Sequence, residues 1–162
     1  MRFIELDLQD EFMLTTLYPL YQNYEAEISG GEVEDFFPID EHEDNFEDFL
    51  NCFKGCTTYI CVIDEEYKGF VNCHMDSEER PGYAKGYNGW GHMSDIYVDK
   101  QSRGLGIGKL MVRMAEKKLS EYDKKGIYLT DLSGKGFFWE SLGYIDTGKT
   151  EPNGGQICEK YV

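Results

Sequence analysis

Three glycines alternate past the middle of the chain: Gly104, Gly106 and Gly108, with Arg103 before them and Lys109 behind. Apolar residues then recur with the spacing of one helix face, so we expect the glycines to form a loop that opens a helix. The first amides of a helix lack intrahelical partners and lie at the positive end of its dipole, which favours a bound phosphate. Glycine suits such a loop because a side chain would hold the anion away from the backbone.

Two common phosphate-binding loops do not fit this spacing. A P-loop requires Gly-x-x-x-x-Gly-Lys-Ser/Thr, whereas here Leu110 follows Lys109 and the first glycine would fall at Arg103. A dinucleotide loop requires Gly-x-Gly-x-x-Gly, and its third glycine would fall at Lys109 or at Met111. A nucleotide-binding domain of either kind is therefore disfavoured.

A third loop pattern does fit. The run Arg103–Gly108 matches Arg/Gln-x-x-Gly-x-Gly/Ala and follows an apolar segment that ends at Val98 and Asp99. Further along, Phe138 to Tyr144 reads Phe-Trp-Glu-Ser-Leu-Gly-Tyr. Together and in this order, the two runs resemble the GNAT superfamily of N-acetyltransferases, which has the first pattern in its acetyl-CoA loop and commonly Phe-Tyr-Glu-x-Leu-Gly-Phe later. Residues 91–148 carry the resemblance.

The resemblance implies an α/β (α+β) fold in which residues 1–162 form one GNAT-like domain. Its mixed, mostly antiparallel sheet of about six or seven strands is expected to splay at the centre, with helices on both faces. The splay would separate the strand at 96–98 from the strand at 127–131, and the pantetheine arm of acetyl-CoA would lie in the gap. The implied acetyl-CoA-binding residues are Ile96, Tyr97, Val98, Arg103, Gly104, Leu105, Gly106, Ile107, Gly108, Lys109 and Phe138.

The implied reaction is direct transfer of the acetyl group to a primary amine in a ternary complex. An alkyl ammonium has a pKa of about 10.4, so a base must remove its proton before attack. Asp131 is the first candidate, because the family often has a carboxylate on that strand; Asp95, His92 and the acids of the segment 32–35 are the others. Strand periodicity alone does not say whether Asp95 faces the sheet or the groove.

One position departs from the family pattern. Where the family usually has a tyrosine that protonates the leaving thiolate, this chain has Trp139, whose indole N–H donates a hydrogen bond but is no useful acid. Three hypotheses follow: the thiolate leaves unprotonated, another donor such as Ser133, Tyr97 or Tyr128 takes part, or the protein is a non-catalytic acyl-CoA-binding module. Trp139 and Ser133 therefore join the two aspartates as candidate catalytic residues.

Charge is unevenly distributed along the chain. The net charge is −15, which disfavours nucleic acid as a partner. Residues 1–51 hold 15 acids and one base, Arg2, whereas the glycine loop and the helix after it are basic. This distribution suits an anionic cosubstrate and a cationic amine acceptor, either a small molecule or a peptide. Polyamines, aminoglycosides, amino acids and protein amines all stay open, and the family also allows a homodimer.

Several expectations concern the protein's surroundings. No apolar run is long enough to cross a membrane and no secretory signal is visible, so neither membrane association nor secretion is expected. Five cysteines without framework spacing indicate free thiols in a reducing cytoplasm. No pair among His42, His74 and His92 has metal-ligand spacing, so we predict no metal.

Local patterns predict the remaining elements. Pro19 is expected to kink or restart the first helix near Tyr18. The acidic and aromatic link 32–40 fits either an amine-binding lid or a solvated connector, and we expect the loop 77–90 to lie over the acceptor site. Helices are expected at 10–28, 44–53, 104–122 and 135–142, and strands at 3–6, 57–63, 70–75, 91–98, 127–131, from 144, and at 156–161.

Overall fold

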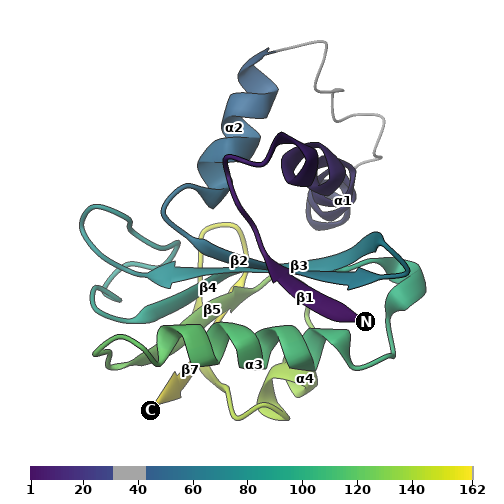
Figure 1. Ribbon diagram of the computed structural model, residues 1–162. Helices are drawn as coiled ribbons and strands as arrows, with labels where there is room; N and C mark the ends of the chain where they lie inside the picture. Colours follow the sequence, from purple (N-terminus) through teal and green to yellow (C-terminus); the bar gives the residue numbers. More distant parts are fainter. Residues whose placement is uncertain (31–42, 162) are drawn as a thin grey trace.

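A central sheet separates two layers of helices (Figure 1). The computed structural model describes residues 1–30 and 43–161, and the link 32–40 lies outside them. Helices α1 and α2 cover one face of the sheet, and α3 and α4 cover the other, as predicted. The helices are α1 (Glu11–Ser29), α2 (Glu43–Phe53), α3 (Ile107–Leu119) and α4 (Gly136–Glu140), with a short 3-10 turn at Lys100–Ser102.

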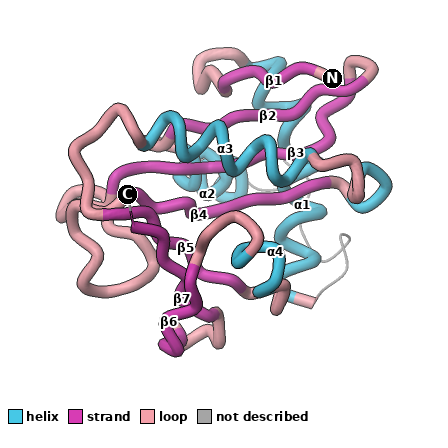
Figure 2. Tube along the Cα trace, turned by 90° about the horizontal axis from the view of Figure 1, so that it is seen from below, coloured by secondary structure: helices cyan, strands magenta, loops and turns pink. Residues whose placement is uncertain are grey.

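Within the described residues, seven strands form the sheet in the order β1-β2-β3-β4-β5-β7-β6. The strands are β1 (Arg2–Glu5), β2 (Thr57–Ile63), β3 (Glu66–Met75), β4 (Gly91–Val98), β5 (Gly126–Asp131), β6 (Ile145–Thr150) and β7 (Gln156–Tyr161). All neighbours are antiparallel apart from β4 and β5. Those two are parallel and pair only at Gly91–Ile127 and His92–Tyr128, and β5 then runs away from β4 (Figure 2). The predicted mixed sheet with a central splay is confirmed.

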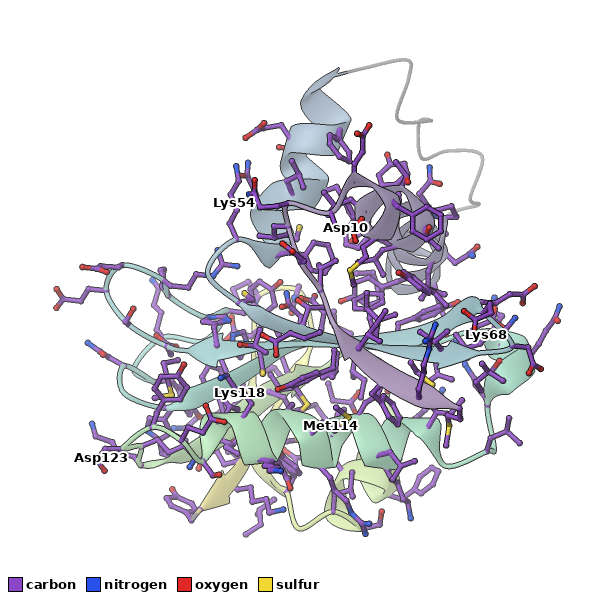
Figure 3. The ribbon with its side chains drawn as sticks, viewed as in Figure 1. Asp10, Lys54, Lys68, Met114, Lys118 and Asp123 are labelled. Atoms are coloured by element: carbon purple, nitrogen blue, oxygen red, sulfur yellow. The ribbon has the colours of Figure 1, made fainter. Side chains whose placement is uncertain are left out.

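Each helix layer has its own apolar core, and side chains fill the space on both sides of the sheet (Figure 3). On one side, α1 and α2 bury Leu17 and Phe49 against Phe70 of β3. On the other, α3 buries Met111 and Ala115 against β2, β3 and β4. Fully burying a side chain of this size contributes about 1.5–3 kcal/mol, so both helix layers are firmly attached to the sheet. No described helix is long and apolar enough to span a membrane.

A β-bulge in β4 decides which of its side chains face which helix layer. Asn72 of β3 pairs with Asp95, but the next residue of β3 pairs with Met93, which leaves Ser94 as the extra residue. A bulge breaks the two-residue period of a strand. Met93 therefore packs in the α3 core, whereas Asp95 and Tyr97 face α1.

Three of the differences from the sequence predictions concern the first helix and the starts of β3 and α3. Of the expected kink or restart near Tyr18, the restart is wrong, because Pro19 lies inside one helix, α1, and a kink stays a prediction. Asp10, labelled in Figure 3, caps this helix by accepting a hydrogen bond from Met13 N at 3.1 Å. Strand β3 begins at Glu66 rather than 70, because the hairpin turns tightly at two residues with positive φ, 64 and 65. Helix α3 begins at Ile107 rather than 104, because the earlier glycines form the loop itself.

The loop 77–90 folds back onto the start of the splay. Its Tyr87 stacks on Tyr128 of β5 at 4.1 Å between ring centroids, and its Tyr83 meets the His92 ring edge-on at 5.1 Å. Gly82 passes so close that a Cβ there would lie 1.7 Å from the Tyr128 hydroxyl oxygen. The loop thus covers β4 and β5 on the same face as α1 and α2.

We predict that Pro19→Ala stabilises the protein. Proline in a helix interior costs up to about 3 kcal/mol relative to alanine, partly offset because proline also restricts the unfolded chain. Pro19 is exposed, so no core contact is lost, and the free energy of unfolding should rise by about 1–2 kcal/mol in urea denaturation. Asn23→Ala, one turn later, is the control and should add only about 0.5 kcal/mol. Equal or lower stability of the proline variant would contradict the cost assigned to Pro19.

Candidate functional site

A cavity of about 580 Å³ opens where β4 and β5 separate. Its wall consists of the end of β4, the glycine loop with the start of α3, the last turns of α1, and the segment around α4. The lining residues are Tyr24, Glu27, Ile28, Ile96, Tyr97, Val98, Ser102, Arg103, Gly104, Gly106, Ile107, Gly108, Lys109, Ser133, Lys135 and Phe138. Ten of the eleven predicted acetyl-CoA-binding residues line this cavity. Leu105 does not, and its side chain is 64% exposed.

The glycine loop has the backbone that a phosphate site needs. Gly104 and Gly106 adopt φ values of 85° and 79°, a left-handed conformation that other residues rarely take. Gly106 precedes α3, and no side chain caps the helix there. The first bond into the helix runs from Leu110 N to Gly106 O at 3.2 Å, so the amides of residues 107–109 are left for a ligand.

Positive side chains surround this end of the cavity. Arg103 donates from Nε to Val98 O at 2.9 Å and from Nη2 to Glu27 Oε2 at 2.7 Å, which ties the loop to both β4 and α1. The hydrogen bond from Arg103 holds the pKa of Glu27 below its usual value. Lys109 and Lys135 also line the cavity. Three cations around a helix N-terminus suit a ligand with several phosphates.

Asp95 lies beside the cavity, on the face of the sheet that α1 covers. Its Oδ1 accepts a hydrogen bond from the hydroxyl of Tyr24 at 2.8 Å, and its Oδ2 accepts one from Asn72 Nδ2 at 3.2 Å. The same Asn72 amide donates to Cys52 O at 2.9 Å, and its Oδ1 accepts from Thr58 at 2.9 Å. Asp95 is half-buried and accepts both bonds, as an ionised carboxylate does.

Asp131, the first candidate base, lies elsewhere. It ends β5, is buried, and its Oδ1 accepts from Ser133 N at 2.8 Å and from Ser133 Oγ at 2.6 Å. Its Oδ2 has no hydrogen-bond partner among the described residues. These bonds shape the turn after β5, and Asp131 does not line the cavity, whereas Ser133 does.

Trp139 and Phe138 of α4 separate into two environments. Phe138 lines the cavity, and its Cζ would lie 3.4 Å from a Cβ at Gly108. Trp139 is buried in the α3 core, with its ring centroid 5.6 Å from that of Tyr144. The departure from the family motif therefore places an indole in the core rather than a donor in the cavity.

Two histidines are buried near the start of the splay. His92 is fully buried between Tyr128, His74 and Tyr83, and neither of its ring nitrogens has a hydrogen-bond partner among the described residues. Burial lowers the pKa of His92 to about 3, and burial with the nearby Arg80 charge lowers that of His74 to about 4. Both are therefore neutral at pH 7.

In residues 1–30 and 43–161, no three His, Cys, Asp or Glu side chains gather as metal ligands would, and the absence of a metal stays a prediction.

Sequence reasoning missed the contribution of α1. Tyr24, Glu27 and Ile28 line the cavity, and their spacing of three and four residues places them on one side of a helix. The spacing could have shown that the three residues share one helix face, but nothing in the sequence links Tyr24 to Asp95, which lies 71 residues away. The acids of the segment 32–35, which were also candidate bases, lie outside the described residues.

The sequence matches the model of the family described as the Acetyltransferase (GNAT) family over residues 20–144. No relative is found among curated protein sequences. Solved structures with the same fold include PH1933 from Pyrococcus horikoshii OT3, at 21% identity, with 99% of this chain and 98% of that chain covered and a TM-score of 0.71.

Two further structures are those of named acetyltransferases. An aminoglycoside 6'-acetyltransferase of type Ii has 18% identity, covers 99% of this chain and 97% of its own, and has a TM-score of 0.69. The PaiA N-acetyltransferase from Thermoplasma acidophilum, in complex with coenzyme A, has 14% identity, full coverage of both chains (100% each) and a TM-score of 0.70. At these identities the likeness shows a shared fold.

We predict that Gly106→Val lowers acetyl-CoA affinity at least about ten-fold, because strain of roughly 1–2 kcal/mol at positive φ would shift the loop amides. Isothermal calorimetry measures this affinity. Gly148→Val is the matched control: Gly148 has a similar φ of 72°, a Cβ at either glycine meets nothing within 4 Å, and Gly148 lies on β6, away from the cavity lining. Unchanged affinity in the Gly106 variant of a folded protein would count against the loop.

We predict that acid weakens the fold partly through His92. The unfolded histidine gains a proton below about pH 6.5, but the folded one does not until about pH 3, so this contribution is complete above pH 6.5 and is lost as pH falls. His92 should cost about 2 kcal/mol of unfolding free energy between pH 6.5 and 5. His92→Phe keeps a ring on Tyr128 without a titrating group, so its stability should fall less over this range in urea titrations. Parallel pH profiles for the two proteins would refute this role.

Proposed function

The chain belongs to the acetyltransferase (GNAT) family, and on that premise we propose that it is an acetyl-CoA-dependent N-acetyltransferase. Its acceptor is the primary amine of a small cationic molecule or a peptide, which attacks the thioester directly in a ternary complex. The observation that carries the proposal is the cavity at the splay of β4 and β5, which the glycine loop lines and whose lining residue Tyr24 bonds Asp95.

The cavity residues fit acetyl-CoA by chemical type. The amides of residues 107–109 and the cations Arg103, Lys109 and Lys135 suit its phosphates. Ile28, Val98 and Phe138 suit its apolar parts. Beyond His92, the side of β4 that faces β5 has no strand partner within the described chain, so its backbone groups are left to bond the amide-bearing pantetheine arm. Bound acetyl-CoA supplies the thioester whose acetyl group is transferred.

We assign the role of base to Asp95 rather than to Asp131. Asp95 lies on the face of the sheet that α1 covers, where the neighbouring Glu25 adds negative charge that would attract an ammonium. Asp131 is tied to the turn before α4 by two hydrogen bonds from Ser133. The two structural neighbours, an aminoglycoside acetyltransferase and an N-acetyltransferase, also support an amine acceptor.

The buried position of Trp139 favours a second candidate, a module that binds acyl-CoA without turning it over. A panel of an aminoglycoside, a polyamine, free amino acids and lysine peptides separates the two, with thiol release from acetyl-CoA as the readout. Amine-dependent release supports the enzyme. Tight acetyl-CoA binding without release for any amine supports the module.

We predict that Asp95→Asn lowers kcat by about a hundred-fold or more, because general base catalysis contributes about 10²–10⁴-fold. The asparagine oxygen still accepts from Tyr24, but its amide nitrogen would face the donor nitrogen of Asn72, so urea denaturation should accompany the kinetics. The KM for acetyl-CoA should change little, because Asp95 does not line the cavity. Asp131→Asn is the comparison and should keep a kcat within about five-fold of wild type, since its side chain still accepts from Ser133. The reverse ranking of the two variants would show that Asp131 is the base.

A further inference from the structure

The structure offers another hydroxyl in place of the motif tyrosine, which this chain replaces by Trp139. Tyr24 of α1 lines the cavity with its neighbour Ile28, and its hydroxyl donates to Asp95 Oδ1 at 2.8 Å. One side chain therefore touches both the cavity proposed for acetyl-CoA and the carboxylate proposed as the base. We propose that Tyr24 is the acid that protonates the departing coenzyme A sulfur, in a relay with Asp95. This inference rests on the proposed acetyltransferase function.

The phenol of Tyr24 is held in a fixed position. Its ring packs edge-on against Phe70 at 5.5 Å and against Tyr97 at 5.9 Å between centroids. The carboxylate it bonds is fixed from the other side by Asn72, whose own amide is oriented by Thr58 and by Cys52 O. A rigid donor beside a reaction cavity loses little freedom when it engages a new partner, which favours proton transfer.

The other candidate donors are committed elsewhere. Tyr97 also lines the cavity, but the guanidinium of Arg103 lies over its ring at 5.5 Å, at the phosphate end. The Tyr128 hydroxyl donates to the buried Asp76 at 2.6 Å, and the Ser133 hydroxyl donates to Asp131 at 2.6 Å. Trp139 lies in the α3 core. Of the donors considered, Tyr24 alone both reaches the cavity and bonds the base.

The ammonium form of the acceptor first loses one proton to solvent, and the proton balance of the transfer itself then closes without a further reactant. The lone pair of a neutral amine forms the C–N bond to the acetyl carbonyl carbon, and the C–S bond breaks with its electron pair remaining on sulfur. Asp95 accepts the surplus proton from the nitrogen, and Tyr24 gives its hydroxyl proton to the sulfur. The protonated Asp95 then returns a proton to the Tyr24 oxygen across the existing hydrogen bond. The products are the amide and the free thiol, and both side chains are restored.

The electrostatics of the pair match this order of events. Burial, and then the Asp95 charge, raise the pKa of Tyr24, so the phenol keeps its proton until the reaction begins. Once Asp95 has taken a proton from the amine, that negative charge is gone and a new donor faces the Tyr24 oxygen. Both changes make the phenol a stronger acid at the moment when the thiolate forms.

The test compares Tyr24→Phe with Tyr21→Phe. Tyr21 lies one turn earlier on α1, packs in the same aromatic cluster, and also has a hydrogen-bonded hydroxyl, 3.2 Å from Cys52 Sγ, but it does not line the cavity. The first readout is calorimetric affinity for coenzyme A at pH 6 and at pH 10, with desulfo-coenzyme A as the control ligand. A hydrogen bond to a charged group is worth roughly ten-fold or more in affinity, and it is present only when the bound thiol ionises.

We expect Tyr24→Phe to weaken coenzyme A binding about ten-fold at pH 10 and less than about three-fold at pH 6, with desulfo-coenzyme A unaffected at either pH. With an amine from the panel that is turned over, kcat should fall about a hundred-fold while the KM for acetyl-CoA stays the same. Tyr21→Phe should match the wild type in both readouts.

Equal coenzyme A affinities for Tyr24→Phe and wild type at pH 10 would overturn the role of Tyr24 and leave the acetyltransferase proposal standing. So would a Tyr21→Phe variant that behaves like Tyr24→Phe, because the effect would then come from the helix rather than from one hydroxyl. Failure of the wild-type protein to release thiol with any amine would instead remove the proposed function.

Discussion

The two strands at the centre of the sheet, β4 and β5, form only two residue pairs before they diverge, and the rest of the site depends on this separation. Backbone groups that lose a strand partner must be satisfied in another way. Here the divergence opens the cavity and exposes the end of β4 to it. The chain after β4 then forms the glycine loop, which also lines the cavity. Parallel strands can separate like this because β4 remains paired with β3 on its other side, apart from the bulge at Ser94, and β5 remains paired with β7.

A second constraint, the bulge at Ser94, determines which side chains of β4 face the α3 core and which face α1. Ile96 and Val98 pack against the α3 core and reach the cavity, whereas Asp95 is turned toward α1. Helix α1 then joins the two halves of the site: Glu27 bonds Arg103 of the glycine loop, and Tyr24, one turn earlier, bonds Asp95. A shift of α1 would thus move both Arg103, beside the glycine loop, and the Asp95 carboxylate.

Features that depend on contacts between residues near in sequence were predictable, whereas features that depend on contacts between distant segments were not. The loop from Arg103 to Gly108 was predictable because its chemistry is local: glycine conformations and helix amides are set within a few residues. The direction of Asp95 was not, because one extra residue in a strand reverses the alternation. The role of α1 was not either, since its contact with Asp95 forms only when the whole sheet is assembled. Trp139 was predicted at a reactive position and lies in the core, because the short helix α4 turns that side away from the cavity.

The central claim is that the splayed strands and the glycine loop form an acetyl-CoA site. Calorimetric titration of the intact protein with acetyl-CoA, alongside ATP and NAD, tests it most directly. We expect saturable binding of acetyl-CoA in the micromolar range, on the order of −8 kcal/mol, with no comparable affinity for ATP or NAD. A folded protein that gives no heat with acetyl-CoA, or that prefers ATP or NAD, would contradict it.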